Sequence, residues 1–422
     1  MANGQWKRRR PFCLPPRARS SWATDSLAPW LSGAGPLYKL CFCGTSASSP
    51  MAPRQNMIEE LSPEIVDHIS EHLPPSSQRS LSMVSRSFRK RLEHHVFASI
   101  RLRTRSDTLR FISHLTSYPS WSSFVKSLTI EIPAWEISLA TSGKLRQEKN
   151  RTPEDDPAIL ARTLYKGIDY FSVLHNLERL VFVEGTYDDL SIIGIALQAQ
   201  FDNLQEFSYT SSSSQHPDAC DLDTFLCRHP FIKKLDLPPA LKHHPGGLEL
   251  PKLTSYSGSQ DFFQDVVSTP DLKYAKLVVS RKSSGTVLNA DSIRSLWFSC
   301  SANLSSLECY LGRIDTSYDI LTSIARFLPH LESLKITWDN SVMEHFDVKG
   351  RIQDFGSLLP LFSQLKSFDF EAHLPLQNQA LTVNTAAEIA SYCPSLVSCG
   401  FLSECWTRDD VKHPWTQRHR WK

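Results

Sequence analysis

Apolar residues recur along the chain at positions i, i+3 and i+5, from residue 97 almost to the end. In the ten units from Val125 onward, Gly258 is the one pattern position of thirty that is not apolar. The intervening positions are polar or small except at Val181, Tyr274 and Val397. Such alternation is typical of short strands with one buried and one solvated face. The sequence therefore predicts eleven strands, at Phe97-Ile100-Leu102, Val125-Leu128-Ile130, Leu177-Leu180-Phe182, Leu204-Phe207-Tyr209, Ile232-Leu235-Leu237, Leu253-Tyr256-Gly258, Leu272-Ala275-Leu277, Leu304-Leu307-Cys309, Leu331-Leu334-Ile336, Leu365-Phe368-Phe370 and Leu396-Cys399-Phe401.

The spacing between these units predicts what connects them. From Leu177 onward, successive first positions lie 19 to 34 residues apart, which is enough for one strand and one returning helix. The interval from Val125 to Leu177 is 52 residues and contains a charged insertion, 144–157, which we expect to be an exposed loop. Helical spacing of apolar residues predicts connecting helices over 158–174, 188–199, 222–227, 262–267, 320–328 and 386–392.

The pattern L-x-x-L-x-L at intervals of roughly 20–30 residues resembles the leucine-rich repeat. That resemblance implies an α/β solenoid with parallel strands on its inner wall and helices on its outer wall. The repeats depart from the regular family pattern, because their lengths vary and the usual asparagine after the strand is mostly absent. A non-repeat α/β fold therefore remains an alternative.

A different pattern precedes the strands, between Met57 and Leu102. Ser62 is a good helix N-cap and Pro63 suits the first helical position. Ile65, Ile69 and Leu73 follow at four-residue spacing, which predicts one amphipathic helix. Pro74 and Pro75 are expected to end it.

A second helix is expected to start after Ser76 or Ser77. It would carry Leu81, Val84 and Phe88 on one face, with Leu92 a turn later. A helical piece this short buries little apolar surface by itself. It is therefore either the first layer of a larger core or a docking element that completes its core on a partner.

These helices resemble an F-box, the module that binds the Skp-type adaptor of cullin-RING ubiquitin ligases. Ser62 stands where the family usually has proline, and Pro-Pro-Ser-Ser-Gln stands where the family often has acidic residues. The alternative is an ordinary helical hairpin that caps the repeats. The resemblance implies that eight residues serve either to dock the adaptor or to pack the module, and the sequence does not show which residue does which. They are Leu61, Pro63, Ile65, Ile69, Leu81, Val84, Phe88 and Leu92.

An F-box followed by leucine-rich repeats resembles the substrate receptors of Skp–cullin–F-box ligases, of the kind found in large sets in fungi. The resemblance implies a non-catalytic subunit whose partners are the Skp-type adaptor, through it a cullin-RING ligase, and an unknown protein substrate. The alternative is a repeat scaffold without a ligase role. The strand residues that do not point inward would face the substrate, and the candidates are Lys126, Glu178, Arg179, Lys233, Asp236, Lys273, Tyr274, Lys276, Glu332 and Lys335.

Charge and composition narrow the possible partners. Residues 1–56 hold eight basic residues and one acidic residue, whereas the rest of the chain carries a net charge of about −5 against a total of +2. A mildly acidic body argues against nucleic-acid binding. No apolar run reaches the length of a membrane span. The ten scattered cysteines suggest reduced thiols, in the cytoplasm or nucleus, and they lack the paired spacing of a zinc site.

No catalytic motif and no cofactor-binding motif stands out, so we expect neither an enzyme nor a cofactor. His94-His95 and His243-His244 are adjacent pairs whose side chains are expected to point apart into solvent. The predicted organisation is a disordered tail over 1–56, the helical module over 57–96, the repeats over 97–405, and a tail or cap over 406–422. The basic run Lys7-Arg8-Arg9-Arg10 suits nuclear import, while prolines oppose a mitochondrial presequence; alternatively, translation starts at Met51 or Met57.

Overall fold

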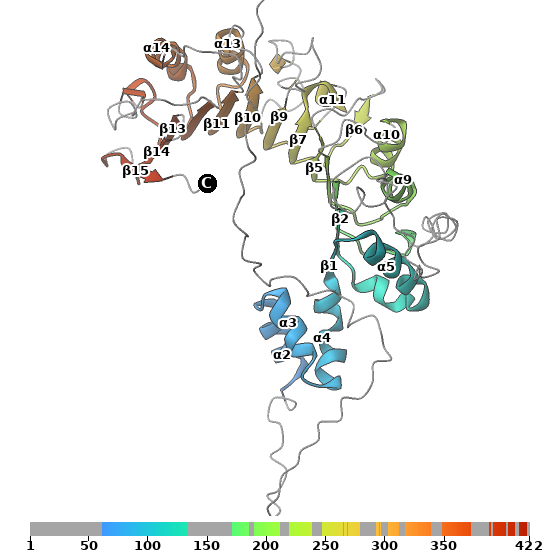
Figure 1. The fold of residues 1–422 in the computed structure, drawn as a ribbon. Coiled ribbons are helices and arrows are strands. Elements are labelled where there is room, and N and C mark those ends of the chain that lie inside the picture. The colour runs from blue at the N-terminus through green and yellow to red at the C-terminus, as the bar shows by residue number, and fades with distance from the viewer. Residues whose placement is uncertain are drawn as a thin grey trace, which may run out of the picture. The chain divides into compact units, whose positions relative to one another are not determined.

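The computed structural model contains a helical module followed by a long mixed α/β region (Figure 1). The N-terminal tail, the insertion at 144–157 and the His243-His244 pair lie outside the residues that it describes. The described residues are 61–132, 171–184, 190–211, 219–238, 247–264, 266–267, 269–278, 293–294, 296, 303–311, 317–338, 348–372, 388–389, 391–401, 404–409 and 413–419.

The helical module has three helices: α2 (Pro63–Glu71), α3 (Pro75–Ser82) and α4 (Arg86–Ala98). Proline occupies the first position of both α2 and α3, where its missing N–H costs no hydrogen bond. The segment expected to form the second helix is divided between α3 and α4, because the chain leaves the helix at Met83 and Val84. Ser85 then caps α4 by accepting a hydrogen bond from the Phe88 amide at 3.2 Å.

Among the described residues, a 13-stranded sheet follows the module, and its strand order is the chain order apart from β6 and β8, which form a separate pair. The prediction of a parallel sheet is confirmed, since the first eleven strands of this sheet are parallel to one another. These strands are β1 (Ser99–Leu102), β2 (Ser127–Ile132), β3 (Arg179–Glu184), β4 (Glu206–Ser211), β5 (Lys234–Asp236), β7 (Ser255–Ser259), β9 (Tyr274–Val278), β10 (Ser306–Leu311), β11 (Ser333–Trp338), β12 (Ser367–Ala372) and β13 (Ser398–Phe401).

The apolar positions of the sequence pattern are stacked in register across the sheet. One row, formed by the i+3 positions, pairs Leu128 with Leu180, Leu180 with Phe207, and so on to Phe368 with Cys399. These side chains are 0–1% exposed from Leu128 to Cys399, as are most of those in the neighbouring i+5 row. The pattern that predicted the strands therefore forms the continuous apolar core of the sheet.

Helices connect the strands and lie along one side of the sheet (Figure 1). Aromatic contacts attach them to the buried rows: the Phe225 ring lies 5.0 Å from that of Phe207, and the Phe355 ring lies 5.1 Å from that of Phe368. The longer helices are α5 (Arg105–Ser117), α9 (Leu190–Gln198), α10 (Ala219–Arg228), α13 (Ser317–Phe327) and α14 (Val348–Leu358), with the short 3-10 helices η1 (Pro119–Phe124) and η4 (Leu359–Leu361).

Some connectors differ from the sequence prediction. The helix expected at 262–267 is α11 (Gln260–Gln264), after which β8 (Val266–Val267) pairs with β6 (Leu248–Glu249). The helices α5 and α14 were not predicted. The helix expected at 158–174 lies outside the described residues except at its end. Short β-branched runs such as Val266–Val267 are ambiguous between helix and strand, and pairing decides between them.

Asparagines just before the strands link successive strand-entry turns. The Asn176 side chain donates a hydrogen bond to the Ser123 carbonyl at 2.8 Å, and Asn203 donates to the His175 carbonyl at 3.0 Å. Asn303 donates to the Pro270 carbonyl at 2.6 Å in the same way. These bonds satisfy backbone groups at the turns that enter the strands.

The C-terminal end of the sheet is a hairpin, at the place where a tail or a cap was expected. Strand β14 (Glu404–Thr407) pairs antiparallel with β13, and β15 (Thr416–His419) pairs antiparallel with β14. The Trp406 side chain is fully buried in the core. Arg408 donates to the Leu396 carbonyl at 2.6 Å, and its guanidinium lies 4.8 Å from the Trp415 ring centre. No periodicity marked this hairpin, because each strand has only four residues.

A buried histidine, His229, links the end of α10 to the turn that precedes β4. His229 accepts a hydrogen bond from the Phe201 amide at 2.9 Å through Nε2, and it donates to the Phe225 carbonyl at 2.6 Å through Nδ1. Burial lowers the pKa of His229, although the bond to Phe225 opposes this effect. The neutral ring is therefore the form that the fold requires.

We expect the free energy of unfolding to fall as the pH decreases below about 6.5, because the unfolded chain then binds a proton that the folded chain excludes. Urea unfolding midpoints at pH 8, 6.5 and 5 test this. In His229→Gln the dependence should be shallower, since the amide does not titrate. An equally steep loss in both proteins would contradict this role of His229.

Candidate docking surfaces

The helical module exposes apolar side chains to solvent. Ile65 and Ile69 on α2 are 49% and 43% exposed, and Met83 and Val84 in the α3–α4 turn are each 66% exposed. These four residues, called the exposed apolar set below, are among nine large apolar residues that are exposed in the described part of the chain. Single exposed apolar residues are ordinary, but four within twenty residues mark a candidate interaction surface.

A separate set of side chains packs the inside of the module. Val66, Phe88 and Leu92 are 0–2% exposed, and Leu61, Leu81 and Val96 pack against them. Val66 follows Ile65 directly, and consecutive helix positions lie on different faces. The face of α2 that carries Ile65 and Ile69 is therefore the exposed one.

The structure separates the eight residues that the F-box resemblance singled out. Phe88 and Leu92 are buried, and Leu61 and Leu81 are half-buried against them. In contrast, Pro63, Ile65, Ile69 and Val84 are exposed. Met83 is also exposed but is not among the eight residues. The apolar spacing over 81–92 gave no sign of the turn between α3 and α4 in which Met83 lies.

Polar bonds hold the three helices of the module together. Gln78 on α3 donates to the Ser70 carbonyl at 2.7 Å and to the Leu73 carbonyl at 3.1 Å, both near the end of α2. Arg91 on α4 donates to the Leu61 carbonyl at 2.9 Å. These bonds satisfy backbone groups that the helix ends leave open.

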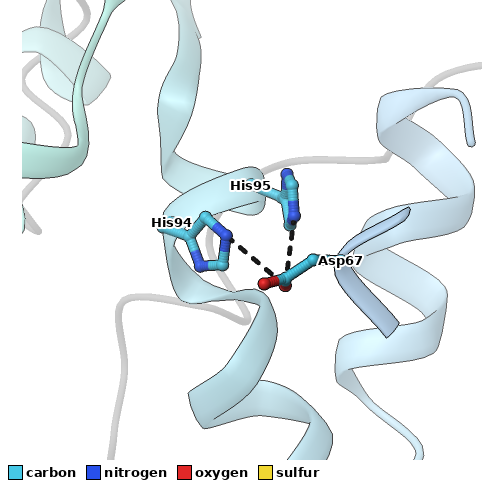
Figure 2. Close-up of side chains that lie close together, drawn as sticks. All are labelled: Asp67, His94 and His95. Atoms are coloured by element: carbon cyan, nitrogen blue, oxygen red, sulfur yellow. Dashed lines mark ion pairs between the residues drawn. The ribbon is translucent and has the colours of Figure 1, made fainter. Parts of the chain in front are cut away.

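His94 and His95 do not point apart as expected. Both rings approach the carboxylate of Asp67 on α2 (Figure 2): Nε2 of His94 lies 3.5 Å and Nε2 of His95 lies 3.4 Å from the same oxygen, Oδ1. The ring centres are 4.1 Å apart. Adjacent helix positions diverge by about 100°, but a group placed between them on a neighbouring helix can be reached by both.

The second candidate surface is the polar face, which we define as the face of the sheet opposite the buried rows. Several predicted substrate-facing residues form exposed cross-strand pairs near it. Arg179 lies 3.3 Å from the Glu206 carboxylate, and Lys126 lies 3.7 Å from the Glu178 carboxylate. Exposed pairs of this kind contribute about 0–1 kcal/mol each. They determine the charge pattern of the surface more than its stability.

Three of the predicted residues, together with residues of β10 and β12, form a network on the polar face. Glu308 is 9% exposed. It accepts a hydrogen bond from the Tyr274 hydroxyl at 3.0 Å and lies 3.1 Å from the Lys276 ammonium and 3.6 Å from that of Lys335. Lys335 also lies 3.3 Å from the Glu371 carboxylate. The network places a buried carboxylate among two cations and one phenol.

The remaining predicted residues lie outside this network. Asp236 accepts a hydrogen bond from Ser208 at 3.2 Å. Lys233 donates to the Gln205 side chain at 2.9 Å, and Glu332 accepts from Lys366 at 3.0 Å, both just before their strands. Lys273 also precedes its strand and is exposed. The ten predicted residues thus occupy two zones, the strands themselves and the turns that enter them.

The network changes the acid–base behaviour of its members. Burial, followed by the nearby Glu308 carboxylate, raises the pKa of Tyr274 well above its usual range. The pKa of Lys335 is raised as well: burial lowers it, but the Glu308 and Glu371 carboxylates outweigh that effect. Lys335 is therefore charged and Tyr274 is neutral at physiological pH.

We expect the folded protein to lose stability as the pH rises above about 10. The folded state retains the Tyr274 proton that the unfolded chain releases in that range. Tyrosinate absorbance, compared with that of Tyr274→Phe, isolates this one phenol. In Glu308→Gln the pKa of Tyr274 should move down toward its ordinary value, and an unchanged titration would contradict the role of Glu308.

Comparisons with known proteins identify the helical module. Residues 58–98 match the family model of the F-box domain, so the F-box prediction is confirmed for this segment. No curated protein matches the chain. One solved structure, a protein from Bacteroides fragilis determined by a structural genomics consortium, aligns with a TM-score of 0.36 and 12% identity over 71% of this chain and 73% of that one. Among the described residues, no helix is long and apolar enough to cross a membrane.

Proposed function

We propose that this protein is a substrate-recognition subunit of an Skp–cullin–F-box ubiquitin ligase. The observation that carries this proposal is the F-box domain at 58–98, whose helices leave the exposed apolar set outside their own core. An F-box domain implies a Skp-type adaptor as partner. The link to the cullin follows from the adaptor, and the covalent chemistry would belong to other subunits.

The exposed fractions of the eight F-box residues support two separate roles, contact with the adaptor and packing of the module. Pro63, Ile65, Ile69 and Val84, with Met83, would contact the adaptor, because burying exposed apolar surface is the main favourable term in association. The buried and half-buried residues of the module would instead maintain its shape. Docking and folding would thus rest on different side chains of the same short segment.

The region after the module would bind the substrate. We propose that its parallel strands and connecting helices form a leucine-rich-repeat solenoid, which the in-register rows of pattern residues support. The polar face of mixed charge suits a protein substrate better than a small molecule, which needs a concave and mostly apolar pocket. Holding the substrate near the ligase would act by raising its effective concentration.

Co-expression of the full chain with a Skp-type adaptor tests the proposal. We expect the two proteins to co-purify at a 1:1 ratio through size exclusion, and addition of the cullin–RING pair to give a quaternary complex. A chain that folds but captures no adaptor would overturn the ligase role and leave the repeat scaffold. Loss of the cullin step alone would limit the role to adaptor binding.

A further inference from the structure

The cluster formed by Asp67, His94 and His95 joins two helices of the module without forming ordinary hydrogen bonds. Nε2 of His95 is buried and has no hydrogen-bond partner among the described residues. Its separation from Asp67 Oδ1, 3.4 Å, exceeds the usual hydrogen-bond range of about 2.7–3.2 Å. A buried ring nitrogen without a hydrogen-bond partner costs free energy. The position of Nε2 facing the Asp67 carboxylate therefore requires a further source of stabilisation.

We propose that Asp67, His94 and His95 bind a divalent late first-row transition-metal ion, with Zn²⁺ as the representative. In a tetrahedral site with bonds of about 2.0–2.1 Å, ligand atoms lie about 3.3–3.4 Å apart. The two nitrogen–oxygen separations, 3.5 and 3.4 Å, are close to this value, and all three ligand atoms lie within 4.8 Å of one another.

The chemistry of the ligands favours this class of ion over others. Two imidazoles and one carboxylate suit Zn²⁺, whereas Mg²⁺ and Ca²⁺ prefer oxygen ligands alone. The site is also accessible, because the side chains of His94 and Asp67 are 44% and 42% exposed while that of His95 is 14% exposed. Three protein ligands leave one position for water, as in other open zinc sites.

A metal ion here would link α2 to α4. The first helix carries Ile65 and Ile69 of the exposed apolar set, and the second continues directly into β1 at Ser99. Bound metal would therefore stabilise the module by holding two helices that otherwise share a small apolar core. This site is independent of the proposed ligase role, since none of its ligands belongs to the exposed apolar set.

Titration of the untagged full chain with Zn²⁺ tests the site. We expect calorimetry to show one Zn²⁺ bound by this cluster and the thermal unfolding midpoint to rise when it binds. Asp67→Asn and His95→Gln should each weaken that binding at least about tenfold, because even outer-shell partners typically matter by 10–100-fold. Both variants keep the size of the side chain, and circular dichroism without metal verifies their folding.

The module itself offers the matched control. His68 on α2 and His72 at its C-cap are exposed, and their ring centres lie 4.9 Å apart, so they could chelate an ion by themselves. The double variant His68→Gln/His72→Gln should bind Zn²⁺ as the natural chain does. The proposal is overturned if only that control loses binding, or if Asp67→Asn and His95→Gln leave the titration unchanged. It is also overturned if the natural chain binds no Zn²⁺ at concentrations up to about 100 µM.

Discussion

Replacing Ile65 and Val84 with aspartate is expected to abolish capture of the Skp-type adaptor while leaving the protein folded. Both side chains are largely exposed, so their replacement removes little from the core of the module. In a complex, each aspartate would be buried without a partner charge. Central apolar contacts typically contribute 2 kcal/mol or more, which corresponds to at least about 30-fold in affinity for each residue.

Two comparisons make this result specific to the docking surface. Phe231 is 63% exposed at the turn between α10 and β5, far from the module in sequence, and Phe231→Asp likewise replaces an exposed apolar side chain with aspartate. That variant should capture the adaptor normally. Val66→Ala, in the module core, should lower stability before it affects capture. If Phe231→Asp is as impaired as Ile65→Asp/Val84→Asp, the exposed apolar set is not the docking surface.

The second large effect is expected at the C-terminal end of the sheet. Trp406→Ala should lower the free energy of unfolding by about 3–5 kcal/mol, the usual range for deleting a fully buried large aromatic side chain. Trp406 lies on β14, which pairs with the last parallel strand, β13, and it is 0% exposed. Its loss would open the end of the apolar core to water. Urea unfolding of the full chain measures the change.

Two further variants separate the apolar contribution from the rest. The indole N–H of Trp406 has no hydrogen-bond partner among the described residues, so Trp406→Phe removes an unsatisfied donor and should cost much less than Trp406→Ala. Trp415→Ala removes a half-buried ring and its contact with Arg408, worth about 0.5–2 kcal/mol. Equal losses for Trp406→Ala and Trp415→Ala would show that Trp406 does not seal the core.

Much of the sheet could be predicted because its apolar residues repeat with a period that only a strand satisfies. Each of the eleven expected units contains a strand, although Phe97 belongs to the end of α4 and the first strand starts at Ser99. The C-terminal hairpin could not be predicted in this way. Its two strands are short, and Trp406 becomes a core residue only because β14 pairs with β13.

The candidate sites could likewise be predicted only in part from the sequence. From the sequence alone, spacing along the chain predicted short helices followed by strands with one buried face, and the F-box was predicted from a resemblance to a known family. Only the tertiary structure decided which apolar residues of the module are left exposed, that Tyr274, Lys276 and Lys335 meet at Glu308, and that His94 and His95 meet at Asp67. The physical reason is that local periodicity describes one element at a time. A docking surface, a charge network or a metal site depends on distances between elements that lie far apart in the chain.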